Sequence, residues 1–156
     1  MTTHGHFGFD VDRFCWKLIH EGPDAIICAD SSGLIIFWNH GAERIFGYSA
    51  KEAIGSSLDL IMPENLRARH WAAYSETMRT GKTRYGEGDL LAVPALGKVG
   101  VRISIEFSIF PYRDRDGSLR GVGAILRDVT KRLEEMKALR SAASAQQTTS
   151  RSPLPS

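Results

Sequence analysis

The residue whose type and position best suit chemistry is His70. It lies in a segment, residues 63–81, that predicts a helix, because Pro63 favours a helix start and Gly81 favours a helix end. At about 3.6 residues per turn, one side of this helix, expected to face the interior, carries Leu66, His70, Ala73, Tyr74 and Thr77. An imidazole there is either a hydrogen-bonded core group or a ligand to something bound inside.

Other groups that could bind a metal stand apart from one another. Cys15 and Cys28 form no CxxC pair, so they predict reduced, partly buried thiols rather than a zinc site or a disulfide. His4 and His6 alternate with small residues near the amino terminus. That composition favours a disordered end over a metal-binding tail.

The chain carries no pattern typical of an enzyme. It has no Gly-rich phosphate loop and no nucleophile beside a suitable base. Two acidic pairs, Glu87 with Asp89 and Asp114 with Asp116, fall in predicted turns or strand edges, where solvated carboxylates are common. We therefore expect no catalysis, and we expect no kinase, cyclase or phosphodiesterase domain to follow.

Length and composition predict one globular domain. The 156 residues are 42% hydrophobic and 24% charged, and no apolar run approaches the roughly 20 residues that span a bilayer. The amino terminus lacks the pattern of a secretory signal, so we expect a cytoplasmic protein and no membrane partner. The 20 basic and 18 acidic side chains are interspersed, which argues against nucleic acid as a direct partner.

The first half of the chain predicts an amphipathic helix, a hairpin and two short helical turns. Apolar residues recur at helical spacing over residues 10–20, and Gly22-Pro23 ends that helix. Two β-rich runs, 25–28 and 34–38, flank a turn that contains Gly33. The helical turns span 39–47 and 49–55, and Ser49 with Glu52 forms a capping box in the second.

The second half predicts three consecutive strands and a helix. The first strand spans 84–93 and ends at Pro94; the second, 99–109, alternates apolar and polar residues. A turn at 114–117 leads into the third strand, 119–127. Helix formers follow to Arg140, and the small polar composition from Ser141 onward predicts disorder.

Together these elements predict an α+β fold, a five-stranded antiparallel sheet with helices over one face and an N-terminal amphipathic helix. Several segments in this order resemble a PAS sensor domain: residues 23–30, 33–39, 42–48, 52–55 and 127–130. The implied domain organisation is a disordered tail (1–9), an amphipathic helix (10–21), a PAS domain (22–130), a C-terminal signalling helix (131–140) and a disordered tail (141–156).

The resemblance implies a role in signal transduction, as a sensor, and leaves the ligand open. Flavin-binding light sensors of this superfamily carry a reactive cysteine within an Asn-Cys-Arg-Phe-Leu motif. Nothing in this chain resembles that motif, and neither Cys15 nor Cys28 occupies its position. Flavin photochemistry through a cysteinyl adduct is therefore disfavoured.

The helix around His70 resembles the haem-binding helix of FixL-type oxygen sensors. His70 is followed by Tyr74, Met78 and the pair Thr80-Gly81, with the spacing found in that family. The resemblance implies that haem is the cofactor, that His70 is the axial ligand to its iron, and that Tyr74 adjoins it. Arg84 then lies where a cation could pair with a haem propionate.

The opposite side of the implied haem pocket departs from that family. Counted from His70, the oxygen-binding arginine falls at Leu90 and the alternative methionine ligand falls at Gly88, and neither residue can donate a hydrogen bond or ligate iron through its side chain. The expected pocket is apolar, with one hydroxyl, and is lined by Tyr85, Leu90, Phe107 and Ile109. Such a site suits sensing of CO, NO or redox state better than stable oxygen binding.

A second hypothesis is a PAS interaction or dimerisation module that holds no haem or another small ligand. The apolar stripe of helix 10–20 and the helix after Thr130 then form a homodimer contact. Packing of the first helix on its own sheet is the alternative explanation of its stripe. In either hypothesis, the signal would pass to a separate signalling protein.

Overall fold

The computed structural model of the chain describes residues 8–86 and 88–150. Five antiparallel strands form one sheet in the order β2-β1-β5-β4-β3. This arrangement confirms the predicted α+β class and the five-stranded sheet. The strands are β1 (Ala25–Asp30), β2 (Ile35–Trp38), β3 (Leu91–Leu96), β4 (Arg102–Arg113) and β5 (Leu119–Asp128).

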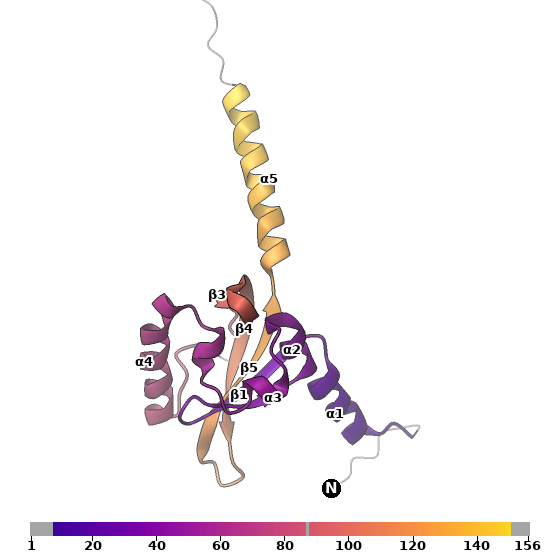
Figure 1. The fold of residues 1–156 in the computed structure, drawn as a ribbon, viewed down its shortest axis with the longest axis vertical. Helices are drawn as coiled ribbons and strands as arrows, with labels where there is room; N and C mark the ends of the chain where they lie inside the picture. The colour runs from indigo at the N-terminus through magenta and orange to yellow at the C-terminus, as the bar shows by residue number, and fades with distance from the viewer. Residues whose placement is uncertain (1–7, 87, 151–156) are drawn as a thin grey trace, which may run out of the picture.

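The helices between β2 and β3 gather beside the sheet, while the terminal helices lie outside this layer (Figure 1). In Figure 1, α4 runs alongside the sheet and α5 projects away from it as a continuation of β5. None of the helices within residues 8–86 and 88–150 combines the length and the hydropathy needed to cross a membrane. The helices are α1 (Val11–Glu21), α2 (His40–Phe46), α3 (Ala50–Ala53), η1 (Leu58–Ile61), α4 (Glu64–Thr80), η2 (Lys98–Gly100) and α5 (Thr130–Thr149).

The hydrophobic core lies between the sheet and the short helices α2 and α3. Alternate residues of β1 are buried, as expected of a strand with one face on a core. Trp38 and Phe46 pack with ring centroids 5.4 Å apart, and the Trp38 indole donates to the carbonyl oxygen of Tyr48. The largest members of the core are Ile27, Ile35, Trp38, Phe46, Ile61, Ile105 and Leu126.

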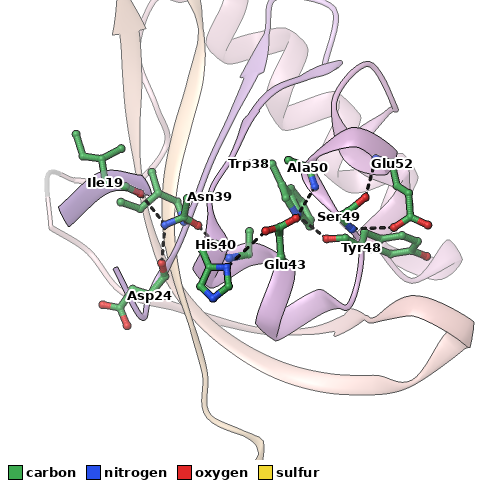
Figure 2. Close-up of polar contacts among 12 residues, drawn as sticks. Ile19, Asp24, Trp38, Asn39, His40, Glu43, Tyr48, Ser49, Ala50 and Glu52 are labelled. Atoms are coloured by element: carbon green, nitrogen blue, oxygen red, sulfur yellow. Dashed lines mark hydrogen bonds and ion pairs between the residues drawn. The ribbon is translucent and has the colours of Figure 1, made fainter. Parts of the chain in front are cut away.

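The side chain of Asn39 joins α1 to this core (Figure 2). Its Nδ2 donates to the carbonyl oxygens of Ile19 and Asp24, at 2.8 and 3.0 Å. Its Oδ1 accepts from the backbone N–H groups of Ile26 and Ala42, at 2.8 and 2.9 Å. Asn39 is 3% exposed, so all four hydrogen bonds are shielded from water.

Cap residues lie at two helix termini that the sequence predicted, the start of α3 and the end of α4. Ser49 and Glu52 form the expected capping box at the start of α3 (Figure 2). Gly81 ends α4 with a φ of 69°, in the left-handed region that glycine adopts without strain. The predicted helix boundaries at these two points are confirmed.

The predicted boundaries of β3 and β4 are wrong. β3 begins at Leu91 rather than Arg84 and runs through Pro94, which is opposite Ser104. Proline is tolerated there because β3 is an edge strand and its backbone needs no donor on the open side. Val99, predicted to begin the next strand, lies in η2 with a φ of 58°, and β4 extends to Arg113.

The C-terminal helix is longer than predicted. The expected disorder from Ser141 is wrong up to Thr149, because α5 is helical over Thr130–Thr149. Alanines and glutamines in this stretch are good helix formers, and hydroxyls such as that of Ser144 donate to the carbonyl four residues earlier. Residues 151–156 and residues 1–7 of the predicted tails lie outside the described residues.

Candidate functional site

Helix α4 is attached to the rest of the domain by side chains on one face and by its C-terminal end. The Trp71 Nε1 donates to Asp59 Oδ1 at 2.8 Å, and the Tyr74 hydroxyl donates to the carbonyl oxygen of Asp30 at 2.5 Å. At the end of the helix, Arg113 on β4 donates to the carbonyl oxygen of Gly81 at 2.6 Å. These contacts fix the direction in which His70 points.

His70 packs against the two aromatic rings that anchor the helix, which also contact each other with centroids 5.5 Å apart. Its ring centroid lies 4.9 Å from that of Trp71 and 5.7 Å from that of Tyr74. Its Nδ1 is buried and has no hydrogen-bond partner among the described residues. A buried polar atom without a partner costs about 1–3 kcal/mol. The structure thus leaves His70 with a ring nitrogen that a bound group could satisfy.

Burial also sets the protonation state of His70. Removal from water lowers the pKa of His70, and the negative charge of Asp59 opposes this shift only in part. The imidazole is therefore neutral near pH 7, the form in which it binds metals. The described residues contain no group of three or more His, Cys, Asp or Glu side chains arranged around a metal position.

Tyr74, predicted to adjoin the cofactor, uses its hydroxyl to attach α4 to β1. Its hydroxyl lies near two carbonyl oxygens of β1, those of Asp30 at 2.5 Å and Ala29 at 3.3 Å. Tyr74 is 8% exposed, and burial raises the pKa of Tyr74, with the nearby charges of Cys28 and Asp30 adding to the effect. The hydroxyl stays protonated and holds α4 against β1, while the ring contacts His70.

The predicted apolar wall is shifted by one residue. Leu90 is 67% exposed and precedes β3, whereas Leu91 is opposite Phe107 on β4 and shares its side of the sheet. Phe107 and Ile109 are half-buried, and Phe107 packs against the core. Tyr85 is half-buried in the segment before β3. Leu91 therefore occupies the wall position that we had given to Leu90.

A cavity of about 430 Å³ lies between α4 and the segment that follows it. Arg84, the predicted cation, is among its lining residues, and Arg69 and Lys82 join it. Sequence reasoning missed these two cations. The four-residue spacing of Arg69, Ala73 and Thr77 could have placed Arg69 on this face of α4, whereas Lys82 lies beyond the end of the helix and gave no such signal. His70 is not part of this lining and stands one turn before Ala73 on the helix.

Comparison with known families agrees with the fold. A family model described as the PAS fold matches residues 19–134. Among solved structures, the PAS domain of a Colwellia psychrerythraea protein superposes with a TM-score of 0.66 at 25% identity, covering 78% of this chain and 99% of that domain. The match to an RNA-binding light-oxygen-voltage receptor covers 97% of this chain and 43% of the receptor chain. Its TM-score is 0.63 at 20% identity, which shows a shared fold.

Curated relatives match over shorter lengths. The sensor protein FixL of Bradyrhizobium diazoefficiens is 44% identical over 54 residues, 35% of this chain and 11% of FixL. The oxygen sensor protein DosP of Escherichia coli is 31% identical over 99 residues, 64% of this chain and 12% of DosP. The chain thus spans only a small part of the length of these relatives. Because the family model covers most of the chain, the protein belongs to the PAS-fold family of sensor domains.

Proposed function

We propose that this PAS domain binds haem through His70 and senses a diatomic gas or redox state. The observation that carries the proposal is the buried, unpartnered Nδ1 of a neutral imidazole on α4. The similarity to FixL and to the oxygen sensor DosP supports a sensory role for the same domain. The resemblance of the His70 helix to that of FixL-type sensors supports haem as the group bound.

The residues around His70 fit a haem group in their chemistry. His70 offers a neutral nitrogen donor, which haem iron accepts as an axial ligand. Arg84 would neutralise a propionate, and Leu91, Phe107 and Ile109 would keep water away from the group. When bound, the iron supplies the centre at which a gas ligand or an electron is taken up.

The apolar wall selects among the gases. Leu91, Phe107 and Ile109 carry no side-chain donor, so a bound oxygen molecule would lack the hydrogen bond that stabilises its partial negative charge. CO and NO depend less on such a donor. The site is accordingly proposed to respond to CO, NO or a change of oxidation state, with weak binding of oxygen.

The proposed relay runs from β4 into α5. The backbone N–H of Ser104 on β4 donates to the Thr130 hydroxyl oxygen at 2.9 Å, and Arg132 pairs with Glu106 at 2.7 Å. The Thr130 hydroxyl also donates to Asp128 at 2.6 Å. A ligand that binds one arrangement of β4 better than another would shift the start of α5 and so signal to a separate protein.

The test is the absorption spectrum of the full chain supplied with haem. The proposal predicts a Soret band that changes on reduction and again on addition of CO. His70→Ala should lose this spectrum, whereas His40→Ala, which removes an exposed histidine on α2, should retain it. An unchanged spectrum in His70→Ala would contradict the assignment of the axial ligand.

A second candidate function is dimerisation through the terminal helices. Three apolar side chains of the stripe predicted on α1 are between 40% and 54% exposed, namely Phe14, Leu18 and Ile19. No residue of α5 is buried, although Leu133, Met136 and Leu139 recur at three-residue spacing. A second copy of the chain would present the same apolar residues on α1 and α5. One symmetric contact between the two copies would cover the apolar residues of both helices.

Sedimentation of the full chain tests this candidate. Dimerisation predicts a concentration-dependent dimer that Leu18→Glu together with Met136→Glu converts into a monomer. Lys17→Glu, on the same helix, is the control, because it changes the charge of α1 without touching the apolar stripe. A wild-type chain that stays monomeric at high concentration would exclude this contact.

A further inference from the structure

We propose that the 430 Å³ cavity beside α4 binds a small organic carboxylate, by a site that does not need His70. Its volume lies in the range of about 300–1,000 Å³ that is typical of small-molecule sites. The inference is independent of the haem proposal, because His70 is not part of the lining, although Arg84 belongs to both.

Three cations stand at the rim of the cavity. Arg69 projects from α4, and Lys82 and Arg84 project from the segment after it. Among the residues that the structure describes, none of these three side chains forms an ion pair or a hydrogen bond; only the backbone of Lys82 is engaged, with the Thr80 hydroxyl. Their positive charges are therefore available to an anion, and the planar guanidinium of an arginine matches a carboxylate with two parallel hydrogen bonds.

The one acidic residue of the lining is already neutralised. Glu76 accepts two hydrogen bonds from Arg79, at 2.7 and 3.1 Å. This pairing lowers the pKa of Glu76, so the carboxylate stays ionised and engaged with Arg79. Because Arg79 is not in the lining, the pair leaves the excess positive charge of the rim in place.

The other residues of the lining offer mainly apolar surface. Ala72 and Ala73 present methyl groups, and the hydroxyls of Thr77 and Thr80 are turned to carbonyl oxygens of α4, at 3.0 and 2.8 Å. The Thr83 hydroxyl likewise donates to the carbonyl oxygen of Tyr85 at 2.6 Å. A ligand with a charged head and an apolar body satisfies both the cations and the apolar surface, whereas an inorganic anion satisfies only the cations.

The probe is hexanoate, added to the full chain carrying His70→Ala and free of haem. Backbone amide resonances of Ala73, Thr77 and Thr83 should shift in a saturable manner, which reports binding at the cavity itself. Hexanol lacks the charge and inorganic phosphate lacks the apolar body. Each should bind at least about tenfold more weakly, the size expected for loss of a charge-assisted hydrogen bond or of a few buried methylene groups.

Charge-removing variants locate the anion. Arg69→Gln and Lys82→Gln should each weaken hexanoate binding by about tenfold, because each removes one charge-assisted contact with the carboxylate. Arg140→Gln makes the same charge change on α5 and should leave the affinity unchanged. These side chains are exposed, so the dispersion of the amide spectrum should remain that of the folded chain.

Three results would overturn the inference: no saturable shift with hexanoate, equal weakening by Arg140→Gln, or equal binding of hexanol. Equal binding of phosphate would reduce the site to a general anion site and contradict the organic ligand. Because the probe protein lacks His70, a failure here leaves the haem proposal standing. Likewise, failure of the haem proposal would leave the proposed carboxylate site unaffected.

Discussion

The indole ring of Trp71 lies directly on Gly33, so closely that a Cβ at Gly33 would stand 2.2 Å from two ring carbons. The same indole donates to Asp59, which prevents the ring from moving aside without loss of that hydrogen bond. The contact of helix α4 with the turn between β1 and β2 therefore depends on glycine at position 33. His70, next to Trp71, takes its position from this contact.

Gly33→Ala should destabilise the fold through this contact. Gly55 is the matched control, because both glycines have positive φ, 79° and 89°, but nothing lies within 4 Å of a Cβ at Gly55. Gly55→Ala should cost about 1 kcal/mol in the free energy of unfolding, and Gly33→Ala about 2–3 kcal/mol. Urea unfolding measures both. Equal losses would show that the Trp71 contact does not matter.

Asn39 should be the polar residue on which attachment of α1 depends most. Asn39→Ala leaves two backbone donors and two backbone acceptors of the core without their partner, which should lower the free energy of unfolding by about 2–4 kcal/mol. The control is Asn65→Ala on the exposed face of α4, which should change it by less than about 0.5 kcal/mol. Similar losses from both variants would refute this role.

Val99 should tolerate replacement better than a valine elsewhere. It is 90% exposed and has a φ of 58°, which a β-branched residue adopts at a cost of roughly 1–2 kcal/mol. Val99→Asn should raise the free energy of unfolding by about 0.5–1 kcal/mol, since asparagine accepts left-handed backbone. Val101 has a φ of −63°, so Val101→Asn should bring no such gain in the free energy of unfolding. Thermal or urea unfolding of the two variants tests the difference.

Glu52 should make stability depend on acid pH. The hydrogen bond from Lys98, together with that from the Ser49 backbone, lowers the pKa of Glu52 from 4.5 to about 2. A carboxylate whose pKa is depressed on folding stabilises the fold above pH 4.5, and this contribution disappears as the pH falls through about 2. Urea midpoints of wild type and Glu52→Gln should therefore differ at pH 6 and converge near pH 2. Glu134→Gln, on exposed α5, should not differ from wild type at either pH.

Local signals explain how much of the fold was predictable. Ser49, Glu52 and Gly81 carry cap chemistry in their own side chains or backbone, so the ends of α3 and α4 could be placed from sequence. β3 was misplaced because proline within a strand is acceptable only at an edge, and strand order is not a local property. The length of α5 was missed because composition alone does not separate a helix rich in alanine from a polar tail.

The candidate site was predictable only in part for the same reason. The helical period placed His70 on the inward face, but its unpartnered nitrogen depends on how Trp71 and Tyr74 pack around it. Leu91, rather than the predicted Leu90, is opposite Phe107, and this follows from the register of β3 on β4. The rim of Arg69 and Lys82 arises from the way the segment after α4 lies along the helix.

Imidazole rescue of His70→Gly would show whether His70 is the residue that binds haem iron. The variant removes the proposed ligand and leaves space for free imidazole, at a helix cost of about 1 kcal/mol. We predict that His70→Gly supplied with haem lacks the Soret spectrum of the wild type and regains it when imidazole is added. A His70→Gly spectrum that matches the wild type without imidazole would contradict the proposal that His70 binds the iron.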